Sequence, residues 1–146
     1  MKVEIFDQPY DPWAEAIQYQ EKCLVAGKFG AMNLFVGTMR DLNEGNSVSS
    51  MTLEHYPEMT QKHLEKIAND AIGKFEIIDV MLLHRVGEVM PSDPIVCVAT
   101  WSVHRAAAYD ANRFIMQDLK AKAPFWKKET LKDQDSKRWV EKNTPG

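Results

Sequence analysis

Residues 77–103, IIDVMLLHRVGEVMPSDPIVCVATWSV, contain two apolar segments joined by a short connection. Ile77–Arg85 alternates in the manner of a β-strand, and residues 95–103 are apolar enough for a central strand. Residues 87–94 carry one glycine and two prolines, which predicts a loop. Because no helix fits between the two strands, the sequence favours an α+β fold with an antiparallel or mixed sheet.

Hydrophobic periodicity predicts the remaining elements on both sides of this stretch. Asp11-Pro12 indicates a helix start, because aspartate accepts a bond from a free backbone N–H and proline suits the first helical turn. Strands are expected at Lys2–Phe6, Ala31–Thr38 (buried) and residues 48–55, and helices at residues 12–25, 64–75 and 106–120. Residues 41–47 read as a turn-rich loop, and the segment after Lys120 as irregular. No repeat or linker is seen, so residues 1–146 are expected to form one domain.

Composition limits the classes of function. The 146 residues are 45% hydrophobic and 27% charged, which is typical of a globular protein with a sizeable core. The formal net charge of −3 gives no general case for nucleic-acid binding. Residues 120–142, however, hold eight Lys or Arg and four Asp or Glu. This basic end could attract an anionic ligand, although a solvated tail explains it equally well.

Cysteine and histidine usage predicts neither a disulfide framework nor a metal site. Cys23 and Cys97 are far apart and have no metal-like spacing, and a reducing compartment fits them. His55 and His63 show no partner spacing, so no metal and no cofactor are expected. No apolar leader begins the chain, and no apolar run approaches the roughly 18 residues needed to span a bilayer. We therefore expect a cytoplasmic protein.

The segment LKAKAPFWKKE, residues 119–129, is the strongest candidate for a reactive site. Pro124 ends a helix, so Lys120 is expected in its last turn and the chain is expected to fold back and present Lys127. Phe125 and Trp126 could wall a pocket between the two amines. A lysine desolvated beside another cation becomes a usable base or nucleophile. The alternative is that these lysines have no catalytic role. Lysines favour helix C-termini, and a Lys-Lys-Glu sequence often lies on a solvated face.

Three other positions could carry chemistry. Arg40 follows the strand that contains Gly37, and its guanidinium could bind phosphate or carboxylate, although a surface arginine is the simpler reading. His104 and Arg105 stand between a strand and a helix start, a natural anion site but a weak signal alone. His84 shares a face with apolar positions of its strand and reads as a core histidine.

Several short motifs follow one another along the chain from about Gly30 to Val140. They are GA at 30–31, FVGTMR at 35–40, LEHYPEM at 53–59, HRVGE at 84–88, SVHR at 102–105, LK at 119–120, APFWKKE at 123–129 and RWV at 138–140. In their joint order and spacing, these motifs resemble the large catalytic subunit of molybdopterin synthase, the MoaE family.

This resemblance implies a fold, partners and a reaction. The fold would be the α/β-hammerhead, with a mixed, largely antiparallel sheet. Two such chains would form a homodimer, and two small ubiquitin-like sulfur-carrier subunits would complete a heterotetramer. Each small subunit would insert a Gly-Gly tail that ends in a thiocarboxylate. The enzyme would be a sulfurtransferase that converts cyclic pyranopterin monophosphate into the dithiolene of molybdopterin, in molybdenum cofactor biosynthesis.

The resemblance also assigns roles by position. Lys120 matches a catalytic lysine that contacts the thiocarboxylate and assists acid/base steps, and Lys127 matches one that supports proton transfer and stabilises negative charge. The matched substrate-binding positions are Thr38, Met39, Arg40, His104, Arg105, Lys120, Lys127, Lys128 and Glu129. Phe35 and Met116 match pocket walls.

The chain also departs from its family, and other functions stay open. Met39 stands where many relatives carry valine, and Lys142-Asn143 stands where relatives can lend a basic residue to a second subunit. Two alternatives remain: a dimeric scaffold that binds a ubiquitin-like tail without chemistry, and a small-anion sensor.

Overall fold

The computed structural model describes residues 1–146 except 44, 123, 132–136 and 141–146. It contains three helices, α1 (Pro12–Cys23), α2 (Pro57–Lys74) and α3 (Arg105–Lys122). The strands are β1 (Lys2–Phe6), β2 (Ala31–Thr38), β3 (Leu42–Asn43), β4 (Asn46–His55), β5 (Ile77–Arg85), β6 (Gly87–Val89), β7 (Pro94–Ser102), β8 (Phe125–Leu131) and β9 (Lys137–Trp139). No helix in the described part of the chain is long and apolar enough to cross a membrane.

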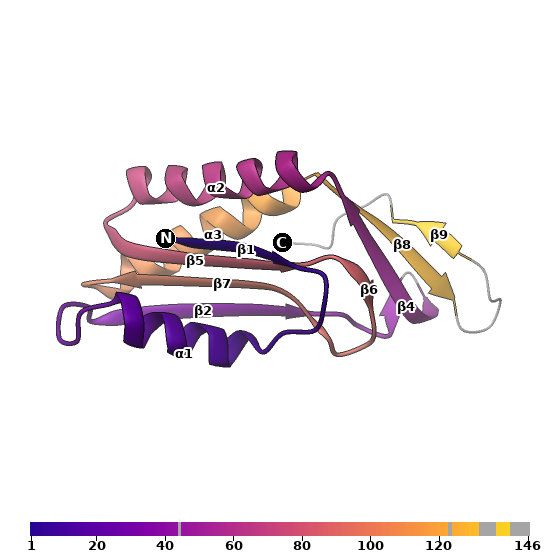
Figure 1. The fold of residues 1–146 in the computed structure, drawn as a ribbon, viewed down its shortest axis with the longest axis horizontal. Coiled ribbons are helices and arrows are strands. Elements are labelled where there is room, and N and C mark those ends of the chain that lie inside the picture. Colours follow the sequence, from indigo (N-terminus) through magenta and orange to yellow (C-terminus); the bar gives the residue numbers. More distant parts are fainter. Residues whose placement is uncertain (44, 123, 132–136, 141–146) are drawn as a thin grey trace.

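A four-stranded sheet in the order β1-β5-β7-β2 forms the centre of the molecule. β1 runs parallel to β5, and the other neighbours are antiparallel, so the predicted α+β class with a mixed sheet is confirmed. Figure 1 shows α2 and α3 on one face of this sheet and α1 on the other. Asp11 caps α1 as predicted, because its carboxylate accepts hydrogen bonds from the backbone N–H groups of Trp13 and Ala14.

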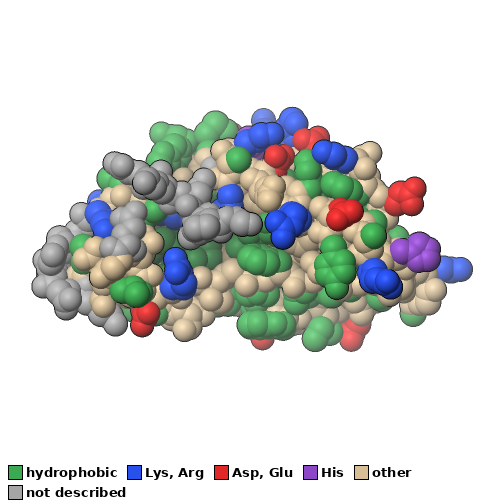
Figure 2. Space-filling model, turned by 180° about the vertical axis from the view of Figure 1, so that it is seen from behind, with side chains coloured by type: hydrophobic (Ala, Val, Ile, Leu, Met, Phe, Trp, Pro, Cys, Tyr) green, Lys and Arg blue, Asp and Glu red, His purple; other side chains and the backbone are tan. Residues whose placement is uncertain are grey.

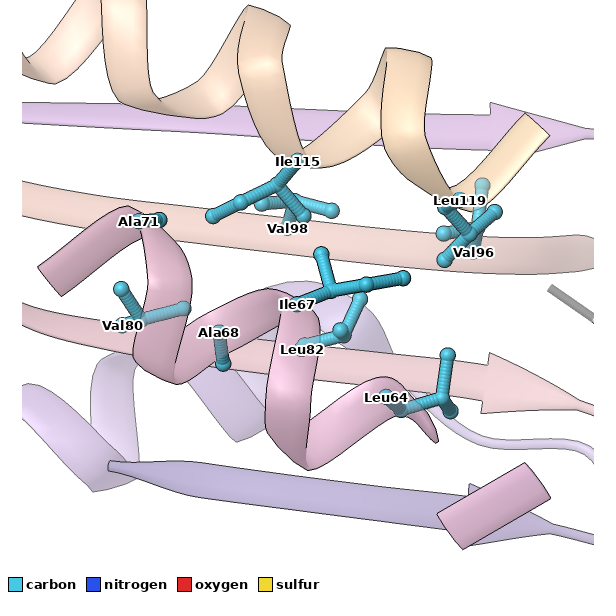
Figure 3. Close-up of a cluster of buried hydrophobic side chains, with 10 residues drawn as sticks. All are labelled: Leu64, Ile67, Ala68, Ala71, Val80, Leu82, Val96, Val98, Ile115 and Leu119. Carbon is cyan, nitrogen blue, oxygen red and sulfur yellow. The ribbon is translucent and has the colours of Figure 1, made fainter. Parts of the chain in front are cut away.

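The main hydrophobic core lies between the sheet and the helix pair α2 and α3 (Figure 3). Ile67 of α2 and Ile115 of α3 point toward Leu82 of β5 and Val98 of β7, and all four side chains are buried. The predicted helical and strand periodicities therefore meet in one core. α2 begins at Pro57, before the predicted start at residue 64, because Pro57 itself occupies the first helical turn.

A second sheet, in the order β3-β4-β8-β9 with β6 also paired to β4, flanks the first (Figure 1). Three predictions were wrong here. Residues 41–47 were expected as a loop but contain β3 and the start of β4, residues 87–94 contain β6, and the irregular segment after Lys120 contains β8 and β9. Their strands are short or strongly charged, so the alternation of apolar residues that marks a strand is weak.

β2 differs from prediction in its environment. It occupies its predicted bounds but lies at the edge of the four-stranded sheet, and it is not fully buried. Met32 and Phe35 are exposed large hydrophobic side chains on this strand. Gly37 is needed where β2 meets β7, because a Cβ there would lie 2.8 Å from the Cγ1 of Val96.

Candidate functional site

The two predicted lysines meet where α3 gives way to β8. Lys120 lies in the last turn of α3, as predicted, and Lys127 lies on β8 opposite Leu53 of β4. Both side chains are half-buried. Burial, together with the charge and hydrogen bond of Lys127, lowers the pKa of Lys120 to about 8, and burial is the largest of these causes. The pair therefore has the electrostatics of a site that can exchange a proton near neutral pH.

Aromatic rings pack beside the lysine pair. Phe125, the first residue of β8, stacks on the His84 ring with centroids 3.9 Å apart and an interplanar angle of 11°. His55, opposite Phe125 on β4, lies farther away, at 6.3 Å between centroids. On the other side of β8, Trp126 contacts Tyr56 edge-on at 5.1 Å. Phe125 thus forms part of the wall beside the lysine pair, whereas Trp126 is exposed.

His84 is buried and uncharged. Its Nδ1 lies 2.7 Å from the carbonyl oxygen of Arg85. Because a carbonyl oxygen only accepts, Nδ1 must carry the hydrogen, which leaves Nε2 unprotonated in the neutral ring. Burial, joined by the charges of Lys120 and Lys127, lowers the pKa of His84 to about 3 against the opposing effect of that bond. The prediction of a core histidine agrees with this burial but missed its place beside the lysines.

The predicted segment 38–40 lies at the same end of the four-stranded sheet as Lys120. Thr38 is opposite Pro94, where β7 begins, and its side chain is exposed. The Met39 side chain is buried among the apolar residues of the second sheet, and its backbone bonds to Asp93 and Ser92. Arg40 is exposed. The N–H of Met39 is used by the Asp93 carbonyl, so its carbonyl oxygen, which can accept a second bond, and the side chains of Thr38 and Arg40 are the groups left for a ligand.

Lys128 and Glu129 occupy opposite faces of β8. The Nζ of Lys128 lies 5.1 Å from the centroid of the Trp139 ring. Glu129 is 4% exposed, and its two carboxylate oxygens accept hydrogen bonds from the Nδ2 of Asn43 at 2.7 Å and the Nε of Arg138 at 2.9 Å. These bonds connect β3, β8 and β9. Glu129 therefore has a structural function in addition to its predicted role in substrate binding.

His104 and Arg105 lie at the other end of α3 from Lys120. Both are exposed, at the junction of β7 and α3. Arg105 and Lys120 are fifteen residues apart on this helix, a span of roughly 22 Å at the α-helical rise. A single chain therefore does not bring these two predicted groups into one pocket. Met116, one turn before Lys120, packs against the main core, and Phe35 is 41% exposed on the edge strand.

The face seen from behind the view of Figure 1 carries charges of both signs. Figure 2 shows several Lys and Arg side chains set among hydrophobic ones there, with Asp and Glu side chains on the same face. Within the described residues, no three His, Cys, Asp or Glu side chains are grouped so as to hold a metal ion. Lys142, predicted as an uncertain contributor, lies outside the described residues.

Sequence reasoning missed His84 and His55 as neighbours of the lysine pair. The signal available was the position of His84 at the end of its strand, on the face covered by the helix that carries Lys120. That face could be assigned from the sequence, but the pairing of β4 with β8 could not, because β8 was not recognised as a strand.

Comparison with known proteins agrees on one family. Residues 8–122 match the family model described as MoaE protein. The chain is 45% identical over 141 residues to the molybdopterin synthase catalytic subunit of Pasteurella multocida, covering 97% of this chain and 90% of that one. Among solved structures, the molybdopterin biosynthesis MoaE protein from Burkholderia ambifaria has a TM-score of 0.78 and 45% identity, covering 95% of this chain and 88% of that one. Molybdopterin synthase from Staphylococcus aureus has a TM-score of 0.82 and 30% identity, covering 95% and 96%.

Proposed function

The chain belongs to the MoaE family, and we propose that it acts as the catalytic subunit of a molybdopterin synthase. In this role it is a sulfurtransferase that moves sulfur from the C-terminal thiocarboxylate of a small sulfur-carrier subunit to cyclic pyranopterin monophosphate. The observation that carries the proposal is the half-buried pair of Lys120 and Lys127, in which the pKa of Lys120 is lowered to about 8. A name that specifies a catalytic subunit, as in the Pasteurella relative, also implies a second subunit.

The lysine pair suits a reaction in which both reactants are anionic. The thiocarboxylate of the small subunit would form an ion pair with a protonated lysine of the pair. Its sulfur would attack a carbon of the pterin substrate and displace an oxygen substituent, which leaves with a proton. Water would then hydrolyse the resulting thioester, so that the sulfur stays on the pterin and the small subunit ends in a carboxylate. Lys120 would transfer protons at that carbon, because its lowered pKa gives both protonation states near neutral pH. Lys127 would stabilise the negative charge that develops. No cysteine of this chain is required, since the sulfur comes from the partner, and Cys97 packs in the core on the α1 face.

Binding of the phosphate ester is assigned to the groups at the sheet end. Arg40 offers a guanidinium, Thr38 a hydroxyl, and Lys128 a second ammonium. We assign the contact at Met39 to its backbone, because its side chain is 5% exposed. This assignment also accounts for the tolerance of methionine where relatives carry valine.

A homodimer would explain how His104 and Arg105, which lie far from Lys120 in one chain, can contribute to a substrate site. β2 is an edge strand of the four-stranded sheet, and its exposed Met32 and Phe35 point to opposite faces beside the free edge, where a second copy could cover both. Antiparallel association of two β2 edges would bring the Arg105 end of one copy to the Arg40 end of the other. Two small subunits on this dimer would complete a heterotetramer. The unpaired thiols of Cys23 and Cys97 fit a cytoplasmic location.

The test is turnover with thiocarboxylated small subunit and cyclic pyranopterin monophosphate, following molybdopterin as its fluorescent oxidised derivative. Lys120→Ala is expected to lower turnover at least about 100-fold, the usual effect of removing an acid/base group. Lys122→Ala is the matched control, because Lys122 is exposed on the same helix and pairs with Asp118 at 3.3 Å. It should stay near the parent rate.

The same experiment separates the alternative functions. Small-subunit binding is measured in parallel for the parent and for Lys120→Ala. A folded parent that binds the small subunit but makes no product would overturn the synthase proposal in favour of a binding scaffold. A folded parent that does not bind the small subunit would favour the small-anion sensor.

A further inference from the structure

His84 and Phe125 connect the two lysines through a stack of rings. His84 is the last residue of β5 on the face that α2 and α3 cover. Its register partner on β7 is Val96, and Phe125 packs against the same core. Phe125 begins β8 two residues before Lys127. With 3.9 Å between ring centroids and an angle of 11°, the two rings are in full face contact. The first residue of β8 is therefore seated directly on the four-stranded sheet.

The His84 ring is itself held in one orientation. The bond from Nδ1–H to the Arg85 carbonyl, at 2.7 Å, fixes the tautomer and the plane of the ring. The side chain is 4% exposed, so it has little room to rotate. A ring fixed in this way can set the position of whatever stacks on it.

We propose that His84 is the positioning residue of the lysine pair: its fixed ring seats Phe125, and Phe125 seats the start of β8 so that Lys127 lies beside Lys120. His84 acts through Phe125 and needs no contact with substrate. The inference deepens the proposed function, on which the catalytic meaning of the pair rests, but the geometry that it explains is a property of the free chain.

The ring at position 84 must be uncharged, because two lysines lie beside it. The titratable groups that act on His84 come from three elements: Lys120 on α3, Lys127 on β8 and His55 on β4. A charged ring at this position would add a cation next to two amines. A neutral imidazole or a phenyl ring can seat Phe125 without that repulsion.

The experiment measures the titration of Lys120 directly, by competitive labelling of the free protein with acetic anhydride across pH and peptide mass spectrometry. The exposed Lys62 is the internal reference. In the parent, the midpoint for Lys120 is expected near 8. In His84→Ala and in Phe125→Leu, loss of the stack should let water reach Lys120 and let Lys127 move away, and the two changes together should raise the midpoint by about one pH unit. In His84→Phe, which keeps a ring, the midpoint should stay within a few tenths of the parent value.

Two results would overturn the proposal. One is an unchanged Lys120 midpoint in whichever of His84→Ala and Phe125→Leu is folded by circular dichroism. The other is a shift in His84→Phe as large as that in His84→Ala, which would remove stacking as the cause. A general loss of stability would lower the melting temperature of the variants without moving this midpoint. Because the labelling needs neither small subunit nor pterin, it can succeed even if the sulfurtransferase proposal fails.

Discussion

The four-stranded sheet and the second sheet fill their inward-facing positions with different side chains. The four-stranded sheet carries two apolar clusters, of ten and seven buried residues, one on each face. The second sheet has one cluster of six, and the inward face of β8 alternates Phe125, Lys127, Glu129 and Leu131. The first region therefore supplies most of the hydrophobic stabilisation, and the second places charged groups where water is partly excluded.

The largest expected effect on stability tests whether the four-stranded sheet supplies most of the hydrophobic stabilisation. Leu82→Ala removes a fully buried side chain between β5 and the helix pair and is expected to cost about 2–5 kcal/mol of unfolding free energy. Ile78→Ala is the control on the same strand, because Ile78 is 44% exposed, and it should cost under about 1 kcal/mol. Urea unfolding of both variants measures the difference.

The second sheet should respond less to the same change. Leu53→Ala, in the smaller cluster, is expected at the lower end of that range, because a small cluster beside a partly open site can relax around the cavity. A cost for Leu53→Ala greater than that for Leu82→Ala would contradict the assignment of the main stabilising core to the four-stranded sheet.

The same contrast decides how much the sequence could predict. In the four-stranded sheet and its helices, every element was expected, because its apolar positions repeat with clear periods; only the start of α2, at Pro57 and not residue 64, differs by more than a few residues. β8 was not predicted as a strand because lysine and glutamate occupy two of its four inward positions. β9 was not predicted because it is only three residues long. Lys120 and Lys127 could still be paired from the sequence, because Pro124 forces the chain to turn between them.

What the sequence could not provide was long-range pairing. The contacts of His84 with Phe125 and of Glu129 with Asn43 and Arg138 depend on which strands become neighbours. The separation of His104 from Lys120 is of another kind, because it follows from the length of α3, which the sequence predicted at residues 106–120. Local periodicity identifies elements, but it does not specify their arrangement.

The acid dependence of stability tests the boundary between the two regions. The pKa of His84 is lowered to about 3 in the folded state, whereas an unfolded histidine titrates near 6.5. The unfolded chain therefore binds the extra proton below about pH 6.5, and stability falls as pH falls from there toward 3. From pH 7 to 5 the loss attributable to His84 is about 2 kcal/mol.

His84→Phe isolates this contribution from that of the carboxylates. The variant keeps a buried ring but has no titrating group there, so its stability should change less than the parent's between pH 7 and 5. Urea unfolding at the two pH values gives the comparison. Equal losses in parent and variant would mean that His84 does not remain neutral in the folded protein.

The smallest of these effects concerns Glu129 and the charged interior of the second sheet. Glu129→Gln weakens the bonds to Asn43 and Arg138, and we expect it to cost about 1–2 kcal/mol of unfolding free energy. Glu88→Gln is the control, because Glu88 is an exposed carboxylate on β6 of the same sheet, and it should change stability by less than about 0.5 kcal/mol. If Glu129→Gln instead melts like the parent but raises the KM for the pterin, this carboxylate serves the ligand more than the fold. The contrast between an apolar sheet that stabilises and a charged sheet that binds would then extend to every charged inward position of β8.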